Sequence, residues 1–181
     1  MAKTRLSKAA YVVHGYGQVE PNHLSARRTG QIYAQLPANK DIDVLENGQF
    51  VKYDYANNEV NFTGAGEWML VFNEIKLYEP RQQDDDFAMI RENYVARVYD
   101  ALGTAMPEGT SMVPRVLKTN VGDIFTTNAV NEAELALGDE LSPAAADGFL
   151  SKSGDGSIKF AVVKVYTMPD GQPGVKVQRI A

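Results

Sequence analysis

The sequence contains no cysteine, which excludes disulfide bonds, thiolate nucleophiles and metal centres held by cysteine. Histidine is almost as scarce, because only His14 and His23 occur. Two histidines without a set of further ligands do not make a metal site, so we expect no metal and no other cofactor. Apolar runs are also short. The longest, Trp68 to Phe72, is far below the ~20 residues that a membrane-spanning helix needs.

The usual signatures of catalysis and nucleotide binding are missing as well. Gly15-Tyr16-Gly17 lacks the third glycine of a dinucleotide-binding turn, because Glu20 stands there. The sequence has no Gly-x-Ser-x-Gly elbow and no phosphate-binding Gly-Lys-Ser/Thr. Acidic residues are plentiful, but nothing in their pattern pairs two of them across a cleft, as a carboxylate-based hydrolase requires. We therefore expect a protein that is not an enzyme.

Charge is divided unevenly along the 181 residues. Residues 1–40 carry six basic groups and one acidic group, a net charge of +5, whereas residues 41–181 carry 12 basic and 22 acidic groups, a net charge of −10. A basic leader on an acidic body indicates that the leader touches something acidic: a neighbouring copy, a larger acidic protein surface or nucleic acid. No apolar stretch of signal-peptide length follows the basic N-terminus, so we expect the chain to stay inside the cell that makes it.

The pattern of residues divides the chain at residue 40. In residues 1–40, glycine, proline, asparagine and serine interrupt isolated apolar residues, which predicts an extended basic N-terminal arm that is ordered on a partner. From residue 41 apolar and polar residues alternate, which predicts a β body over residues 41–181. Within it we expect a first strand block at 41–80, a connection with a short helix and edge strands at 81–120, and a second strand block at 121–181.

The two strand blocks resemble each other. One runs from Gly48 to Tyr78 and the other from Gly138 to Tyr166, spans of 30 and 28 residues. Gly48, Gly122 and Gly138 each precede Gln or Asp and then a strand, because glycine allows a sharp turn and the polar side chain can bond turn amides. The predicted fold is therefore mainly β: a compact antiparallel barrel or sandwich built from two similar strand blocks, with the extended arm and at most one short helix.

The connection carries mixed signals. Asp84-Asp85-Asp86 is suited to cap a short helix rather than to hold a cation, and the apolar face of that helix would be Phe87, Ile90, Tyr94 and Val98. Residues 112–117 then read as an edge strand, because Pro114 cannot donate a hydrogen bond to a neighbour.

A family resemblance follows from this layout. A basic leader, residues 2–39, runs into residues 41–51 (Asp-Ile-Asp-Val-Leu-Glu-Asn-Gly-Gln-Phe-Val), and a β body with Val113-Pro114-Arg115-Val116 and residues 119–128 (Thr-Asn-Val-Gly-Asp-Ile-Phe-Thr-Thr-Asn) follows. The chain resembles structural proteins of tailed-bacteriophage heads, of the capsid decoration or cement type. The resemblance implies a non-enzymatic virion protein, made in the host cytoplasm, that binds and braces major capsid subunits. The same layout is also compatible with another virion component, portal-associated or from the tail.

The arm contains the candidate partner-binding residues. Its basic side chains would make electrostatic contacts, and its aromatic and apolar side chains would be anchors, because aromatic residues dominate the energetics of interfaces. The expected partners are the major capsid protein or other virion subunits, with the chain itself a homo-oligomer or present in many copies, and with no membrane partner. The candidates are Lys3, Arg5, Tyr11, Tyr16, Arg27, Arg28, Tyr33 and Leu36.

The alternative function is that of a β-barrel protein that binds single-stranded nucleic acid. Phe50, Tyr53 and Tyr55 flank Lys52, and small barrels bind single strands through aromatic side chains beside basic ones. Two arguments oppose it: a body with a net charge of −10 repels phosphates, and cross-strand packing explains the aromatic residues more simply.

Overall fold

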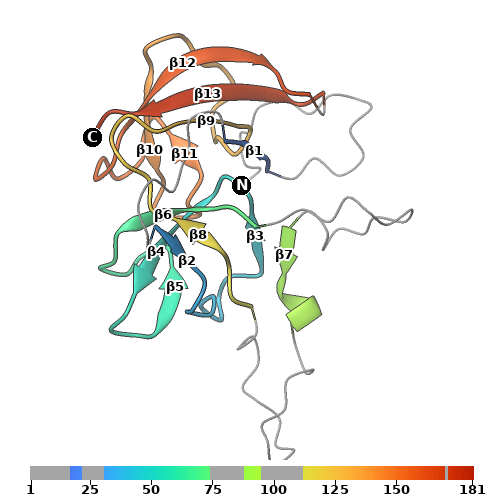
Figure 1. Cartoon of the computed structure of the whole chain (residues 1–181), viewed down its shortest axis with the longest axis vertical. Coiled ribbons are helices and arrows are strands. Elements are labelled where there is room, and N and C mark those ends of the chain that lie inside the picture. Colours follow the sequence, from blue (N-terminus) through green and yellow to red (C-terminus); the bar gives the residue numbers. More distant parts are fainter. Residues whose placement is uncertain (1–16, 22–30, 74–87, 95–111, 170) are drawn as a thin grey trace, which may run out of the picture.

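The computed structural model describes residues 17–21, 31–73, 88–94, 112–169 and 171–181. These residues form three antiparallel sheets, two of which lie face to face as a sandwich (Figure 1). The sequence-based prediction of a mainly β antiparallel fold is therefore confirmed, and of its two alternatives the sandwich is the one that fits.

Six strands make one sheet, five make the second and two make the third. In spatial order, the six-stranded sheet contains β1 (Val19–Glu20), β9 (Ile124–Thr127), β13 (Pro173–Arg179), β12 (Phe160–Thr167), β10 (Glu140–Pro143) and β11 (Leu150–Ser151). The five-stranded sheet contains β2 (Ile32–Tyr33), β8 (Val116–Leu117), β6 (Trp68–Val71), β4 (Phe50–Asp54) and β5 (Glu59–Asn61). The small sheet pairs β3 (Val44–Glu46) with β7 (Ala88–Ile90).

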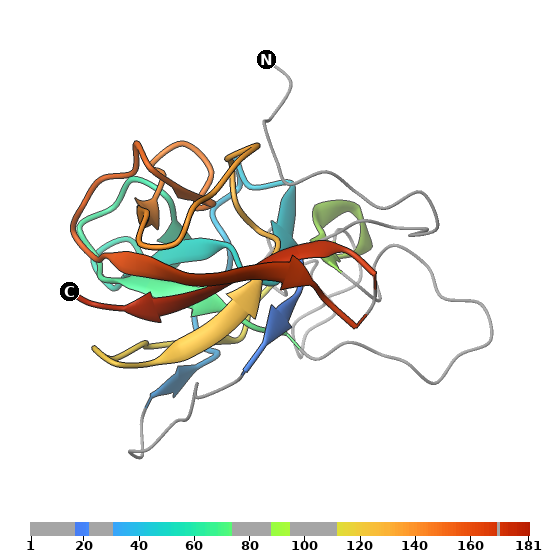
Figure 2. The same ribbon diagram turned by 90° about the horizontal axis from the view of Figure 1, so that it is seen from above.

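The two strand blocks divide between the two large sheets. β4, β5 and β6 belong to the five-stranded sheet, and β10, β11 and β12 belong to the six-stranded one. Seen from above, the long β12–β13 hairpin crosses over the strands of the other sheet (Figure 2). The main core lies between the sheets, and its centre is a contact of three phenylalanine rings from both of them, Phe50, Phe125 and Phe160.

The five-stranded sheet is buried on both faces. Val51, Met69 and Val71 point away from the main core into a second cluster, which Leu45 of β3 and Met89 of β7 cover. All four residues of β6 are buried, as its uninterrupted apolar sequence predicts. The small sheet therefore acts as a lid on the outer face of the larger one.

Three turns of the same design begin strands in both sheets. In each turn a glycine has a positive φ, which L-residues rarely adopt. The side chain of the residue after the glycine accepts a hydrogen bond from the backbone amide three residues before that residue. The φ values are 91° for Gly48, 94° for Gly122 and 85° for Gly138. The bonds are Glu46 N to Gln49 Oε1 at 2.6 Å, Asn120 N to Asp123 Oδ2 at 2.8 Å, and Ala136 N to Asp139 Oδ2 at 2.8 Å.

Each of these turns also docks on a neighbouring strand. The glycine amide donates to a carbonyl of that strand, and the strand returns a bond to the residue after the glycine. The glycine bonds are Gly48 N to Val71 O at 3.0 Å, Gly122 N to Arg179 O at 2.8 Å and Gly138 N to Val162 O at 2.9 Å. The sequence-based interpretation of the glycine pairs as strand-initiating turns is confirmed.

Two expectations for the connection are wrong. Residues Ala88–Ile90 form strand β7 rather than the start of a helix, because Met89 pairs with Leu45 and faces the second core. The described residues of this stretch end with a 3₁₀ turn at Arg91–Tyr94. Strand β8 is not at an edge, because β2 pairs with its free side, and Pro114 lies before the strand. Residues 84–87 lie outside the described residues.

Parts of the expected arm belong to the sheets. Val19–Glu20 pairs with β9, and Ile32–Tyr33 pairs with β8. The amide of Gly17 donates to the buried Glu46 Oε2 at 2.7 Å. Chain pairing therefore begins before residue 41, at the two stretches of the leader that the structure describes.

The glycine turns make a testable difference between two substitutions. Gly138→Ala places a methyl group in open space, so it carries only the conformational cost of a positive φ, about 1–2 kcal/mol. Gly48→Ala has a similar φ, but its methyl group would overlap Thr127 Oγ1 and lie 2.7 Å from Ala129 Cβ, which adds about 1–3 kcal/mol. The free energy of unfolding measured in urea should therefore be highest for wild type, lower for Gly138→Ala and lowest for Gly48→Ala. If the two variants lost the same free energy of unfolding, the side chains around Gly48 would have moved to make room for the methyl group.

Candidate functional site

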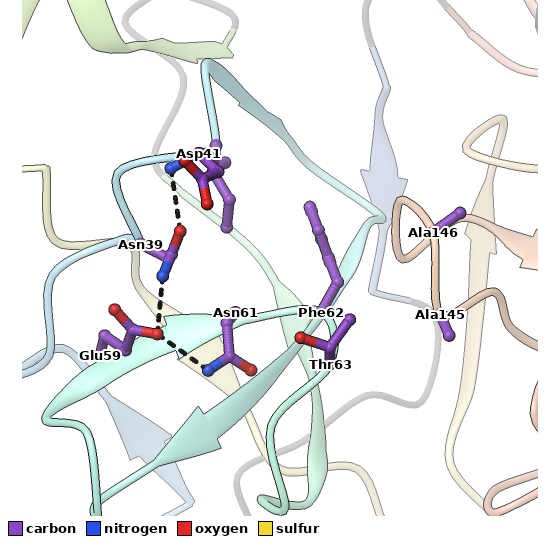
Figure 3. Close-up of a pocket in the computed structure, with 9 residues that line it drawn as sticks. Asn39, Asp41, Glu59, Asn61, Phe62, Thr63, Ala145 and Ala146 are labelled. Carbon is purple, nitrogen blue, oxygen red and sulfur yellow. Dashed lines mark hydrogen bonds between the residues drawn. The ribbon is translucent and has the colours of Figure 1, made fainter.

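A polar recess of about 370 Å³ lies where the two strand blocks meet (Figure 3). One wall comes from β5 and the loop that precedes β3, and the opposite wall comes from the turn at Ala145 and Ala146. Backbone contacts hold that turn in place, since Phe50 N donates to Gly148 O at 2.7 Å and Gln49 Nε2 donates to Asp147 O at 2.9 Å. The lining residues are Asn39, Asp41, Ile42, Glu59, Asn61, Phe62, Thr63, Ala145 and Ala146.

The asparagine side chains of the recess form hydrogen bonds with Glu59 and with backbone amides. Glu59 Oε1 accepts hydrogen bonds from Asn39 Nδ2 at 2.7 Å and from Asn61 Nδ2 at 3.1 Å (Figure 3). Asn39 Oδ1 accepts one from the Asp41 amide at 2.9 Å, and Asn61 Oδ1 accepts one from the Gly64 amide at 2.7 Å. The network therefore fixes the shape of the wall.

The described lining of the recess combines two carboxylates with amide, hydroxyl and apolar side chains. Its carboxylates belong to Asp41 and Glu59, and no histidine, lysine or arginine is among the described lining residues. Within the described part of the chain no group of three or more His, Cys, Asp or Glu residues is placed to hold a metal ion. What remains is a small acidic surface with an apolar floor from Ile42 and Phe62.

A buried arginine supports the loop behind the recess. Arg91 is 8% exposed, and its guanidinium donates to backbone carbonyls: Nε to Ile42 O at 2.8 Å, and Nη2 to Asn39 O at 2.5 Å and Ala38 O at 3.3 Å. Its own amide donates to Asp43 O at 2.8 Å. Sequence reasoning missed this residue, because an arginine that binds main-chain carbonyls leaves no pattern of charge pairs.

Carboxylates elsewhere in the described residues act as braces for turns. Asp54 Oδ1 accepts from the amides of Ala56 and Asn57, and Asn57 Nδ2 donates to Asp54 Oδ2 at 2.9 Å. These hydrogen bonds lower the pKa of Asp54 below its ordinary value, and the bond from the Asn57 side chain has the greatest effect. The pKa of Asp139 is lowered in the same way. The hydrogen bond from the Ala136 amide has the greatest effect, followed by the hydrogen bond from Lys152, whose Nζ is 2.9 Å away.

Asp155 braces the two sheets against each other. Its Oδ2 accepts the indole N–H of the buried Trp68 at 2.6 Å, and its Oδ1 accepts the amide and hydroxyl of Ser157 at 3.0 and 2.8 Å. Burial works to raise the pKa of Asp155, but the hydrogen bonds from Ser157 and Trp68 outweigh it and the pKa is lowered. Lys52 Nζ lies 3.8 Å from the same carboxylate and 4.9 Å from the centre of the Trp68 ring.

The residues of the nucleic-acid hypothesis do not form an exposed platform. Phe50 and Tyr53 are buried in the two cores, at 0% and 3% exposure, so neither ring can stack on a base. Lys52 lies over Trp68, and only Tyr55 is exposed. The hydroxyl of Tyr53 instead accepts hydrogen bonds from the amides of Gln35 and Leu36, both at 3.2 Å.

The candidate arm residues separate into two groups. Lys3, Arg5, Tyr11, Tyr16, Arg27 and Arg28 lie outside the described residues, as do His14 and His23. Tyr33 and Leu36 are half-buried against the second core, and the ring centre of Tyr33 is 5.3 Å from that of Tyr53. The structure therefore places these two side chains against their own chain.

The lowered pKa of Asp155 gives a prediction for stability against pH. A carboxylate whose pKa is lower in the folded state than the ~3.9 of an unfolded chain stabilises the fold above that unfolded value. It loses the effect as pH falls from there through the lower pKa of the folded state. Asp155→Asn keeps an oxygen acceptor for Trp68 and removes the charge. In urea titrations the variant should be less stable than wild type at pH 7, and the difference should shrink towards pH 3. If the stability difference between wild type and Asp155→Asn stayed constant with pH, the charge of Asp155 would not contribute to stability.

Comparisons with protein-family models, with curated proteins and with solved structures found no match to this chain. Among the described residues, no helix is long and apolar enough to cross a membrane. What the chain does must therefore be inferred from the shape and chemistry of its own residues.

Proposed function

We propose that the chain is a non-enzymatic virion structural protein of the capsid decoration type, which attaches to major capsid subunits and braces them. One observation carries the proposal: the carboxylates of five aspartates at turns accept hydrogen bonds from nearby backbone amides. These are Asp54, Asp123, Asp139, Asp147 and Asp155. Such a use of acidic residues gives these turns a fixed shape. A rigid body with shaped loops is what a binding and bracing protein requires.

The body offers surfaces of the kind that a bracing role needs. Tyr55 and Leu137 are 61% and 73% exposed, and each lies in a turn that immediately follows or precedes a strand. Exposed apolar side chains on rigid turns lose little conformational freedom when they contact a neighbour. They are suited to adjacent subunits on a repeated surface, where many weak contacts add through high effective concentration.

The leader supplies the electrostatic part of the proposal. Residues 1–40 have a net charge of +5, which is complementary to an acidic protein surface. We assign partner contact to the six candidates before residue 31 and not to Tyr33 and Leu36, because these two pack against the chain's own second core. The six are Lys3, Arg5, Tyr11, Tyr16, Arg27 and Arg28.

Deletion of residues 2–16 tests the proposal. It removes Lys3, Arg5, Tyr11 and Tyr16 but keeps Gly17 and β1, which are bonded to the body. The shortened chain should unfold at the same urea concentration as the full chain but no longer sediment with shells assembled from the major capsid protein of the same genome. Attachment of the full chain should weaken between about 0.1 and 0.5 M salt, because salt screens surface charge.

Two results would overturn the proposal. One is a full-length chain that never sediments with the shells, and the other is a shortened chain that attaches as tightly as the full one. A matched control replaces Lys159 and Lys176 by glutamine, which removes two positive charges from the body and should leave attachment unchanged. An oligonucleotide shift in the same buffers would instead favour the nucleic-acid alternative.

A further inference from the structure

One long strand edge is left uncovered in the described structure. Strand β12 pairs with β13 along its length, but on its other side the hydrogen bonds end at Val162, which bonds to Gly138 and Asp139. A β-bulge follows at Val163, and from there to Thr167 the described residues place no hydrogen-bond partner on that side. In Figure 1 this strand runs along the upper rim of the molecule.

The backbone groups on this edge point outward at alternate residues. Met168 N donates to Gln172 O at 2.8 Å, so Met168 faces β13. Residues of an antiparallel strand alternate between facing one neighbour and facing the other. Thr167 and Val165 therefore face away from β13, which agrees with the register that sets Pro173, a residue without an N–H, opposite Thr167.

The chain covers comparable edges elsewhere. Val60 of β5 exchanges hydrogen bonds with Pro37 O and Asn39 N, both at 2.8 Å. Leu150 of β11 exchanges bonds with Ala129 O at 3.2 Å and Asn131 N at 2.8 Å. Uncovered edges are templates for pairing with another chain. The β12 edge differs from these two because no described residue pairs with it, and because it exposes apolar side chains, with Val163 at 45% and Val165 at 43%.

We propose that a second copy of this chain occupies the β12 edge. The two β12 strands pair antiparallel about a two-fold axis at Val165, so that Val163 stands opposite Thr167 of the second copy, Lys164 opposite Tyr166, and Val165 opposite Val165. The inference concerns self-association and does not rest on the proposed attachment to a capsid.

Side-chain complementarity selects this register. On one face Val165 meets Val165 of the second copy, a β-branched pair that favours cross-strand packing. On the other face Lys164 meets Tyr166 of the second copy, and Lys164 Nζ already lies 5.3 Å from the ring centre of its own Tyr166. A shift of the pairing towards the bulge would set Lys164 against Lys164, which like charges oppose.

The bulge limits the pairing to a closed dimer. It bends the strand at Val163, next to the point where the loop at Gly138 and Asp139 covers the edge. An isologous contact uses the same edge on both copies, so no open edge of β12 remains to add a third chain. With about five residues on each side the interface is small, and a weak dimer is expected.

The first test is the mass of the chain in solution against concentration. Val165→Lys places two like charges face to face in the dimer while changing a side chain that is already 43% exposed in one copy. Val121→Lys is the matched control, because Val121 is 67% exposed and lies in the turn before β9, outside residues 163–167. At concentrations up to about 1 mM, wild type and Val121→Lys should dimerise, and Val165→Lys should stay monomeric with unchanged urea unfolding.

The second test uses the absence of cysteine from the sequence. In the proposed pairing the two Val165 Cα atoms lie about 5.5 Å apart, which is within the range that a disulfide spans. Val165→Cys should therefore oxidise rapidly to a covalent dimer, and Val121→Cys should not. A wild-type chain that is monomeric at all concentrations, a dimer that Val165→Lys does not dissociate, or equal oxidation of the two cysteine variants would each overturn the proposal. None of these outcomes bears on sedimentation with capsid shells.

Discussion

The contact of three phenylalanine rings holds the sandwich together. Phe50 of the five-stranded sheet has its ring centre 5.2 Å from that of Phe160 and 6.3 Å from that of Phe125, and the latter two, both in the six-stranded sheet, are 5.6 Å apart. All three are fully buried, and each contributes about 1.5–3 kcal/mol through burial alone. The contact joins the two large sheets at the centre of the main core. The glycine turns set Phe50 and Phe125 at the starts of their strands, and the small sheet then closes the face that Phe50 leaves open.

This arrangement explains the distribution of polar groups. Two sheets with one core between them need rigid loops at both ends, and the acidic and amide side chains supply them by bonding free backbone amides. Asp155 shows the principle most clearly, since one carboxylate orders its own loop through Ser157 and anchors Trp68 of the opposite sheet. Carboxylates used in this way hold loops in shape, and both ends of the sandwich depend on them.

Sequence patterns located most strands and the turns that start them, but they did not locate the polar recess. Its walls combine residues near 39, 60 and 145, which are distant in the chain and carry no shared motif. The role of Arg91 could not be predicted for a similar reason, because its partners are backbone carbonyl oxygens, which every residue has. The helix predicted after Asp86 failed because Met89 buries more apolar surface as the partner of Leu45 than on an isolated helical turn. Tertiary packing outweighs a local preference worth only tenths of a kcal/mol per residue.

The sequence by itself determined the class of the fold, since alternation with period two, strand-starting glycines and the buried run at Trp68 each depend only on local geometry. It also determined the separation of positive from negative charge. Tertiary structure alone decided which strands are neighbours, why β8 is internal, how residues 17–20 and 31–39 join the sheets, and where β12 has no partner among the described residues. The physical reason is that strand pairing joins residues far apart in the chain through backbone groups that are the same in every residue, so the choice among partners is made by the shape of the assembled core.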